Sequence, residues 1–381
     1  MVSQHQDQAS GLSVYAERRA HLQKTLFEGV RAPDAALITQ IANVNYLTGF
    51  TGSFAWLVLL PDRAHLITSG IYATQIGMEV PDIPTTVYAP GEESGAVLAD
   101  LLQSWNVRTL GIESSNSIAF LKGLRHRLRK AQITPVLLKA EIEKMRLIKD
   151  AFELERIRAA VAIADAAFEH VQRMLQPGVA EWDIAMEIDF YIRRQGAYPA
   201  FETLVVSGER SALPHGKPTE RRLERGDFVT LDFGARYQGY CSDLTRTVVI
   251  SEVSPEQRRL YRAVLDALER SLDAIRPGRT GRAIDKIARR TLEKYGLADY
   301  FRHSLGHSLG IQVHDGVGFS PREKTRLQPG MVLTVEPGVY VPGFGGVRIE
   351  EDVLVTETGC EVLSRSPRNL MVTGYVSISP R

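Results

Sequence analysis

Residues 231–247 read LDFGARYQGYCSDLTRT, in which two apolar, β-prone runs flank a turn-like segment at 236–239. This pattern predicts a β-hairpin. Aspartate is depleted in strands, yet Asp232 lies in the first arm and Asp243 in the second. A carboxylate that points from a strand into a core is costly unless it is paired or binds a metal. Taken alone, the two acids fit a solvated edge strand better than a metal site, but the residues that follow reverse this preference.

The composition is that of a soluble globular protein. The chain has 381 residues, 44% of them apolar and 24% charged, which is ordinary for this class and long enough for about two domains. Its net charge of +1 gives no reason to expect nucleic acid or a membrane as a partner. The two cysteines, Cys241 and Cys360, indicate neither a disulfide framework nor a zinc cluster. We find no signal peptide and no membrane-spanning run, so the cytoplasm is the expected location.

The first part of the chain alternates between short apolar runs and helical spacing. We predict strands over 35–41, 56–60, 65–68 and 109–113, and helices over 12–30, 94–105 and 118–128. This alternation is typical of an α/β domain, which we place at residues 1–140.

The second part, residues 141–381, begins with a long charged stretch. We predict one helix from 140 to 175 and interpret its charges as a solvated face. Further helices are expected over 182–194, from the cap at Ser254 to Pro277, and over 280–295. In each half of this part, helices precede a β segment that carries acids. A pseudo-repeat would place those acids on facing sheets around one cavity.

Downstream of the hairpin, three further segments carry side chains suited to metal chemistry. Three of the nine histidines lie in the glycine-rich segment 303–314, Glu336 ends an apolar strand before a Pro-Gly turn, and residues 346–355 form a predicted strand. Alternation along that strand places Arg348, Glu350 and Asp352 on one face and Val347, Ile349 and Glu351 on the other.

Together these segments provide a candidate set of metal ligands: Asp232, Asp243, His307, Glu336 and Glu350. Four carboxylates and one imidazole can hold two divalent ions if two of the carboxylates bridge. Oxygen-rich ligation favours an ion such as manganese. Two ions about 3.5–4 Å apart can activate a water and stabilise the charge that develops on an attacked carbonyl.

Each of these residues, in its motif, resembles the metal set of the pita-bread metallopeptidases, which include methionine aminopeptidase, aminopeptidase P and prolidase. The resemblance covers roughly residues 150–375, and the N-terminal portion is similar to the creatinase/prolidase N-terminal domain, which methionine aminopeptidases generally lack. The chain therefore resembles the Xaa-Pro peptidases most. This implies an α/β N-terminal domain (1–140) followed by an α+β pita-bread catalytic domain (141–381).

The resemblance also implies a role for each ligand. Asp232 would chelate one ion, Asp243 and Glu350 would bridge both, and His307 and Glu336 would bind the second. Glu336 would also take the proton of the bridging water.

Four further residues match active-site positions of the family. His303 and His314 correspond to histidines that contact the substrate, and His215 to another active-site histidine. Arg348 corresponds to an arginine that holds the bridging carboxylates. The implied cofactors are two divalent ions, manganese first and cobalt or zinc as alternatives. The implied partners are peptides with proline second and further copies of the chain, as a homodimer or larger. Residues 69–72 read SGIY, where relatives often carry Asp-x-Arg-Tyr.

The sequence leaves alternatives open. Prolidase, which cleaves dipeptides, and aminopeptidase P, which cleaves longer peptides, share every ligand, although the compact length slightly favours a dipeptidase. A metal-free creatinase-type amidinohydrolase uses the same fold but lacks a complete metal set. A non-catalytic binding protein could also reuse the fold, and loss of ligands or of the accessory histidines would indicate it.

Overall fold

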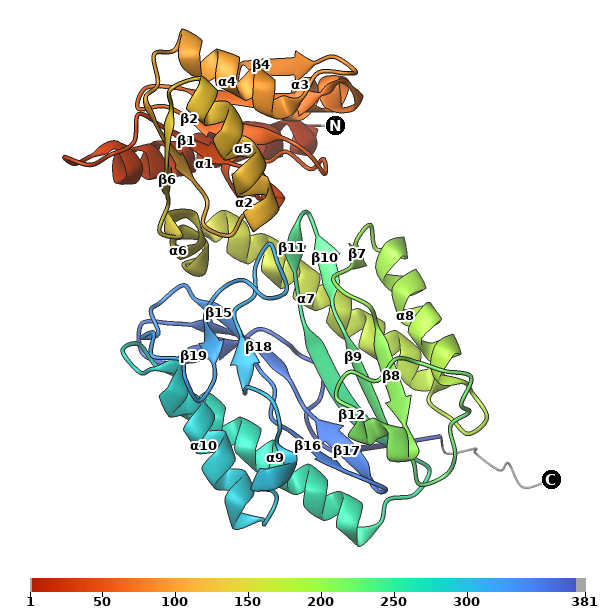
Figure 1. The fold of residues 1–381 in the computed structure, drawn as a ribbon. Coiled ribbons are helices and arrows are strands. Elements are labelled where there is room, and N and C mark those ends of the chain that lie inside the picture. Colours follow the sequence, from red (N-terminus) through yellow and green to blue (C-terminus); the bar gives the residue numbers. More distant parts are fainter. Residues whose placement is uncertain (1, 375–381) are drawn as a thin grey trace. The chain divides into compact units, whose positions relative to one another are not determined.

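The computed structural model describes residues 2–374 and divides into two compact units, Met1–Arg146 and Leu147–Arg381 (Figure 1). The short helix α6 (Glu141–Leu147) belongs almost wholly to the first unit. Arg146 donates from Nη1 to Asn43 Oδ1 at 2.6 Å, and Asn43 donates to Glu143 at 2.9 Å. These contacts explain why the units divide after α6, whereas the sequence placed the boundary before it.

The first unit is built on one mixed six-stranded sheet in the order β4-β3-β2-β1-β5-β6. Its strands are β1 (Ala35–Ile38), β2 (Trp56–Leu59), β3 (Ala64–Ser69), β4 (Thr85–Tyr88), β5 (Thr109–Ile112) and β6 (Thr134–Leu137). Its other helices are α1 (Val2–Phe27), α2 (Ile41–Thr48), α3 (Ala73–Glu79), α4 (Ser94–Ser104) and α5 (Ile118–Lys130). The expected α/β architecture is confirmed, and α2, α3, β4 and β6 are the elements that the sequence did not predict.

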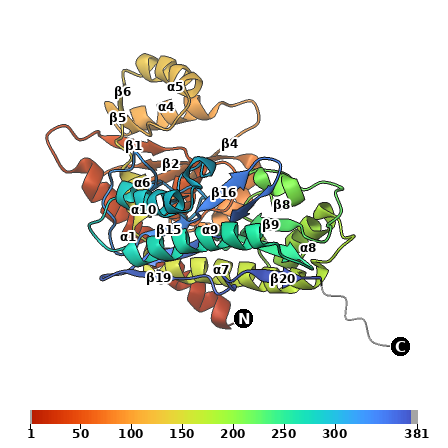
Figure 2. The same ribbon diagram turned by 90° about the horizontal axis from the view of Figure 1, so that it is seen from below.

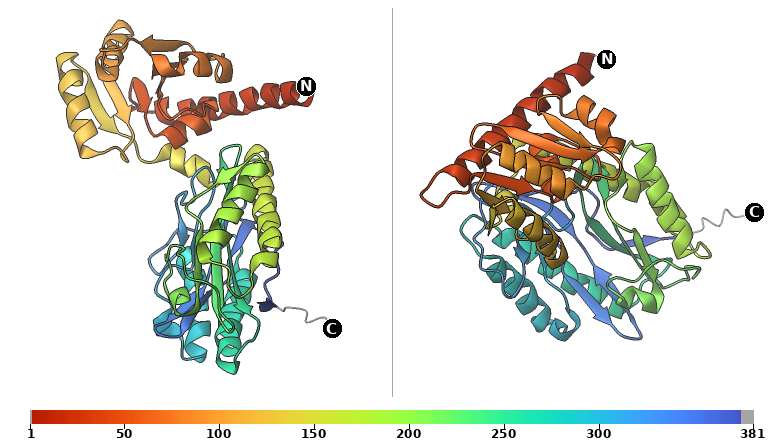
Figure 3. Two further views of the ribbon diagram at one scale, coloured as in Figure 1. Left: turned by 90° about the vertical axis from the view of Figure 1, so that its right-hand side faces the viewer. Right: turned by 45° about the horizontal axis from the view of Figure 1, so that its top comes forward.

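Both faces of this sheet are covered. Leu37 packs with α4 and α5 in one hydrophobic core, while its neighbours Ala36 and Ile38, also fully buried, point the opposite way. Figure 3 shows α1 (red) on the other side of the sheet from α5 (yellow). The unusual segment at 69–72 forms the short 3-10 helix Gly70–Tyr72, in which Ile71 is exposed.

In the second unit the predicted hairpin is confirmed. Strand β9 (Phe228–Phe233) pairs antiparallel with β12 (Leu244–Ile250), and Asp232 lies opposite Thr245. Thr230 and Thr247 are also opposite one another, with their hydroxyl oxygens 3.0 Å apart. The threonines of both arms therefore share one face, and Asp232 lies on that face as well.

The tip of the hairpin is a separate ribbon, β10 (Ala235–Tyr237) and β11 (Tyr240–Cys241), which also pairs with β7 (Tyr198–Pro199). Gln238 and Gly239 close it with φ angles of 46° and 88°, as in the two-residue turns that suit twisted hairpins. Gly234 separates β9 from β10, and a Cβ there would lie 1.9 Å from the Ser242 carbonyl oxygen. Only glycine fits this crossing of the two arms.

Two helix pairs flank the strands of the second unit (Figure 1 and Figure 2). Helices α7 (Ala151–Val171) and α8 (Glu181–Arg194) pack on the sheet β20-β12-β9-β8, where β8 is Leu204–Ser207 and β20 is Met371–Thr373. Helices α9 (Pro255–Ala274) and α10 (Gly281–Lys294) share a second core with strands that follow them in the chain. The strands after α10 are β13 (Gly306–His307), β14 (Gly318–Phe319), β15 (Val332–Val335), β16 (Gly338–Val341), β17 (Gly345–Arg348), β18 (Glu351–Val355) and β19 (Cys360–Val362). The predicted helices after residue 180 are confirmed, including the capping box of Ser254 and Gln257.

The single helix predicted over 140–175 is wrong, because the chain breaks at 148–150 and restarts as α7. Asp150 caps α7 and forms a capping box with Glu153. The solvated face expected there is wrong for Arg146, Lys149 and Glu153, which are 3%, 4% and 1% exposed. Lys149, for example, lies 4.0 Å from Asp315 Oδ2, also buried. The sequence Asp-Ala-Phe-Glu at 150–153 carried the signal of a new helix start.

Within residues 2–374, no helix is both long and apolar enough to cross a membrane. Both cysteines are free thiols.

Candidate metal centre

The structure gathers all of the predicted site residues around one cavity of about 550 Å³ in the second unit. The residues are His215, Asp232, Asp243, His303, His307, His314, Glu336, Arg348 and Glu350. They come from segments far apart in the chain, since the hairpin supplies Asp232 and Asp243, the turn just after β15 supplies Glu336, and β17 supplies Arg348. The arrangement agrees with the pseudo-repeat, in which acids from the two halves face one cavity.

Three of the candidate ligands lie close enough to share one ion. Oxygen or nitrogen atoms of Asp243, His307 and Glu350 all lie within 4.8 Å of one another. His307 Nε2 is 3.5 Å from Asp243 Oδ2 and 3.5 Å from Glu336 Oε1. Glu350 is buried, and its Oε1 has no hydrogen-bond partner among the residues that the structure describes. A buried, unpartnered carboxylate oxygen calls for an explanation, and a cation at this point supplies one.

The electrostatics of the cluster also fit a cation. Burial, and after it the charge of Glu350, raises the pKa of both Asp243 and Glu336 well above that of a solvated carboxyl. Burial and then the charge of Asp232 raise the pKa of Glu350 to about 8. Burial and then the neighbouring His314 lower the pKa of His307 to about 4. The imidazole is therefore neutral at pH 7, as a metal ligand must be, and the carboxylates repel one another in a way that a divalent ion would relieve.

Arg348 connects the acids of the cavity. It forms an ion pair with Asp232 and donates from Nε to Thr245 Oγ1 at 3.1 Å. Thr245 in turn donates to Glu350 Oε2 at 2.6 Å. Arg348 thus contacts Asp232, which the resemblance makes a ligand of one ion, and reaches Glu350, one of the two implied bridging carboxylates, through one hydroxyl.

The strand predicted over 346–355 is interrupted, which corrects the sequence interpretation. Ile349 and Glu350 lie between β17 and β18 and belong to neither strand. The two glutamates nevertheless point to different surroundings. Glu350 lines the cavity, whereas Glu351 accepts from Arg246 Nη2 at 2.8 Å in a fully buried ion pair.

The histidines take distinct places in the cavity. His303 Nε2 lies 2.9 Å from the Tyr340 hydroxyl. The rings of His307 and His314 lie 4.1 Å apart, so the glycine-rich segment between them curves and brings both rings to one cavity. His215 lies on the loop that follows the 3-10 helix η3 (Gly208–Ala212).

Two buried polar residues near this site were given no role by the sequence analysis. The Tyr340 hydroxyl lies between His303 Nε2 and Arg348 Nη1, the latter at 2.7 Å. Asp352 accepts the backbone N–H of Asp243 at 3.0 Å. Tyr340 follows the Glu-Pro-Gly turn closely enough to have been considered, and Asp352 follows Glu350 by two residues, but neither position alone predicts these partners.

Comparisons with known proteins agree with this architecture. The model described as metallopeptidase family M24 matches residues 155–357, and the model of the creatinase/prolidase N-terminal domain matches residues 18–148.

The chain aligns with similar proteins over almost the whole length of both. The chain is 41% identical to an uncharacterized peptidase of Bacillus subtilis, over 89% of this chain and 96% of that protein. It is 35% identical to the Xaa-Pro dipeptidase of Pyrococcus horikoshii, over 89% and 94%. Among solved structures, the Xaa-Pro dipeptidase of Bacillus anthracis matches with a TM-score of 0.87 at 36% identity, over 94% of this chain and 99% of that one. The X-Pro aminopeptidase of Thermotoga maritima matches with a TM-score of 0.83 at 36% identity, over 90% and 98%.

Proposed function

The chain belongs to metallopeptidase family M24, and on this premise we propose that it hydrolyses the bond before proline in Xaa-Pro dipeptides. The observation that carries the proposal is the single cavity lined by the complete candidate ligand set and by three further histidines. Similarity to Xaa-Pro dipeptidases along nearly the whole chain supports the same substrate class.

We propose that Asp232, Asp243, His307, Glu336 and Glu350 hold two divalent ions, with manganese favoured and cobalt or zinc as alternatives. The oxygen-rich donor set and the unpartnered Glu350 oxygen support this assignment. When bound, the ions supply Lewis acidity, which lowers the pKa of water and stabilises negative charge on the attacked carbonyl oxygen.

The chain's own residues perform the proton transfers and the positioning. Glu336, whose Oε1 accepts from Thr334 at 3.2 Å, takes a proton as water oxygen bonds to the carbonyl carbon. The C–N bond then breaks as Glu336 returns that proton to the proline nitrogen. His303, which is hydrogen-bonded to the Tyr340 hydroxyl, contacts the substrate and stabilises the negative charge that develops on the carbonyl oxygen.

Proline explains why such a site is needed. An Xaa-Pro bond has no N–H and its ring fixes φ, so a peptidase that grips an extended backbone loses a hydrogen bond there. A cavity that accepts the ring and surrounds the carbonyl with histidines supplies recognition in another way. Phe201 and Tyr340 contribute apolar surface to this cavity.

The substrate class is tested by comparing peptides with manganese present. We expect Ala-Pro to be hydrolysed faster than Ala-Pro-Ala, and Ala-Ala, the matched peptide without proline, to be hydrolysed much more slowly than either. Faster hydrolysis of Ala-Pro-Ala would make the enzyme an aminopeptidase P. Equal rates on Ala-Pro and Ala-Ala would show that the enzyme does not require proline.

The two other readings of the fold lose support. A metal-free creatinase-type enzyme or a non-catalytic binding protein would have no need of the complete ligand set, yet every member of the set lines the cavity. Metal analysis of the purified protein separates both from a metallopeptidase.

Replacing His303 or His314 by Ala is expected to lower kcat by about 10²–10⁴-fold, the contribution of a positioned acid–base group. Metal content should stay at the wild-type value, because neither histidine belongs to the proposed ligand set. Metal analysis and kcat, measured on the same preparation of each variant, decide the matter. Since the His314 ring lies 4.1 Å from that of His307, loss of a metal equivalent in His314→Ala would make this residue a ligand.

We further propose that the protein is cytoplasmic and assembles as a homodimer or larger, as the sequence and the resemblance imply. The free thiols Cys241 and Cys360 are compatible with a reducing compartment. Light scattering in solution tests the assembly.

A further inference from the structure

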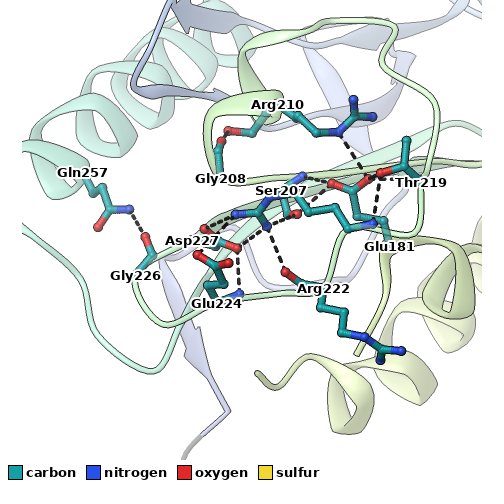
Figure 4. A network of polar contacts seen from close by, with 12 residues as sticks. Glu181, Ser207, Gly208, Arg210, Thr219, Arg222, Glu224, Gly226, Asp227 and Gln257 are labelled. Atoms are coloured by element: carbon teal, nitrogen blue, oxygen red, sulfur yellow. Dashed lines mark hydrogen bonds and ion pairs between the residues drawn. The ribbon is translucent and has the colours of Figure 1, made fainter. Parts of the chain in front are cut away.

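We propose that Glu181 is a positioning residue that fixes the loop carrying His215 over the cavity. The inference rests on the proposed function, in which His215 acts on the substrate. Glu181 lies outside the cavity and is the first residue of α8. Figure 4 shows it at the centre of a polar network with Ser207, Arg210 and Thr219.

The Glu181 carboxylate joins the two ends of the loop. Its Oε1 accepts from the backbone N–H and the hydroxyl of Ser207, both at 2.7 Å. Its Oε2 accepts from the backbone N–H of Thr219 at 3.0 Å and from the hydroxyl at 2.8 Å. Ser207 ends β8 and Thr219 lies beyond His215. One side chain therefore closes the segment 207–219.

Arg210 extends this closure into the loop. Its Nε lies 3.4 Å from Glu181 Oε2, and its Nη2 donates to the Lys217 carbonyl at 2.6 Å. A tighter turn lies inside, in which the Gly216 N–H donates to the Leu213 carbonyl at 3.1 Å. The turn between Arg210 and Lys217 carries His215.

The far side of the same turn contacts the catalytic machinery. Arg348 Nη1 donates to the Pro214 carbonyl at 3.3 Å, and the Gly346 N–H donates to Ser211 Oγ at 2.8 Å. The loop is thus held by Glu181 at its two ends and by β17 at Ser211 and Pro214, and His215 on this loop lines the cavity. Two-sided fixing of this kind sets the position of a side chain.

The charge of Glu181 matters as well as its size. The residue is 0% exposed, and its carboxylate receives four hydrogen bonds and one ion pair. A glutamine amide has the same shape but turns an NH₂ group toward donors on one side. The buried N–H groups there lose their acceptor, and one end of the loop is released.

The network also contains a matched control. Arg221 pairs with Asp227 through bonds of 2.5 and 3.1 Å, and Asp227 is buried like Glu181. Asp227 also accepts the Glu224 N–H at 2.8 Å, so it closes a turn outside the segment 207–219. Arg221 Nη1 also donates to Ser207 Oγ at 2.6 Å, so Asp227→Asn reaches the loop end only through Arg221. Glu181 still accepts the Ser207 and Thr219 N–H groups in this variant, and the His215 loop therefore stays closed.

The test is a double-mutant cycle on Ala-Pro hydrolysis. We expect Glu181→Gln to lower kcat/KM by about 10²-fold, as misplacement of a catalytic group by about 1 Å can do. The double variant Glu181→Gln/His215→Ala should be no slower than His215→Ala alone, because Glu181 acts through His215. Asp227→Asn should leave kcat/KM near the wild-type value. In the double variant Asp227→Asn/His215→Ala, the fold-reduction in kcat/KM should equal the product of the two single fold-reductions, as for independent sites.

Hydrogen exchange gives a readout that does not depend on activity. The Ser207 and Thr219 amides should exchange faster in Glu181→Gln, whereas those of α9 should not change. If the wild type fails to cleave Ala-Pro, the proposed function fails and exchange still tests the loop. If the wild type cleaves Ala-Pro, two results contradict the positioning role. One is a double variant whose fold-loss of kcat/KM is the product of the Glu181→Gln and His215→Ala losses, and the other is unchanged exchange of the Ser207 and Thr219 amides. If Glu181→Gln does not fold, the same cycle with Arg210→Met decides, since this side chain is 32% exposed.

Discussion

Replacing Glu350 by Gln is expected to lower kcat for Ala-Pro by about 10²-fold or more, since even groups that only orient a metal ligand are worth about 10–100-fold. Glu350 lines the cavity and shares the three-residue cluster with Asp243 and His307, whereas Glu351 does neither. An amide at this position presents only one acceptor atom, so it cannot bridge two ions. Metal content should fall together with kcat, while the fold is retained.

Glu351→Gln is the matched control and should have the opposite profile. Glu351 and Arg246 form an ion pair in which both side chains are 1% exposed. Removing one charge from such a pair leaves the other buried and uncompensated, which costs about 3–5 kcal/mol of unfolding free energy. Metal content and kcat of the folded protein should remain close to wild type. Urea unfolding, metal analysis and kcat should be measured on both variants. If Glu351→Gln loses metal and activity while Glu350→Gln loses only stability, the metal ligand is Glu351 and the assignment of Glu350 is wrong.

The second large effect is expected for Asp243→Ala, which should lose bound metal and nearly all activity. Asp243 lies just before β12, is buried, and has Oδ2 3.5 Å from His307 Nε2. In the proposed centre it bridges both ions, so its removal weakens both sites. Atomic spectrometry of the dialysed variant should find less than one ion per chain. Asp227→Asn, which removes a buried acid outside the cavity, should keep the wild-type content, and an Asp243→Ala variant with full metal and activity would refute the ligand assignment.

Much of this centre could be predicted because its signals are local. Asp232 and Asp243 were detectable as acids within a strong hairpin pattern, and the period-two alternation that separates Glu350 from Glu351 persists in their contacts although the strand itself is broken. His307 and His314 were both found in one glycine-rich segment, and their rings do lie at one cavity.

The features that escaped prediction depend on contacts between distant segments. Nothing near Lys149 in the sequence shows that its partner Asp315 will meet it in the interior, so its charge looked like part of a solvated helix face. Glu181 likewise resembles an ordinary acid in the first turn of a helix. Its partners Ser207 and Thr219 become visible only in three dimensions.

In the proposed mechanism, ions held by this cavity are required for hydrolysis of the bond before proline. The direct test is to remove metal from the wild-type protein with a chelator and to titrate manganese back while Ala-Pro hydrolysis is followed. The stripped protein should not hydrolyse Ala-Pro, and activity should rise until two ions are bound per chain. Full activity in the stripped protein, or two bound ions without hydrolysis of Ala-Pro, would contradict this mechanism.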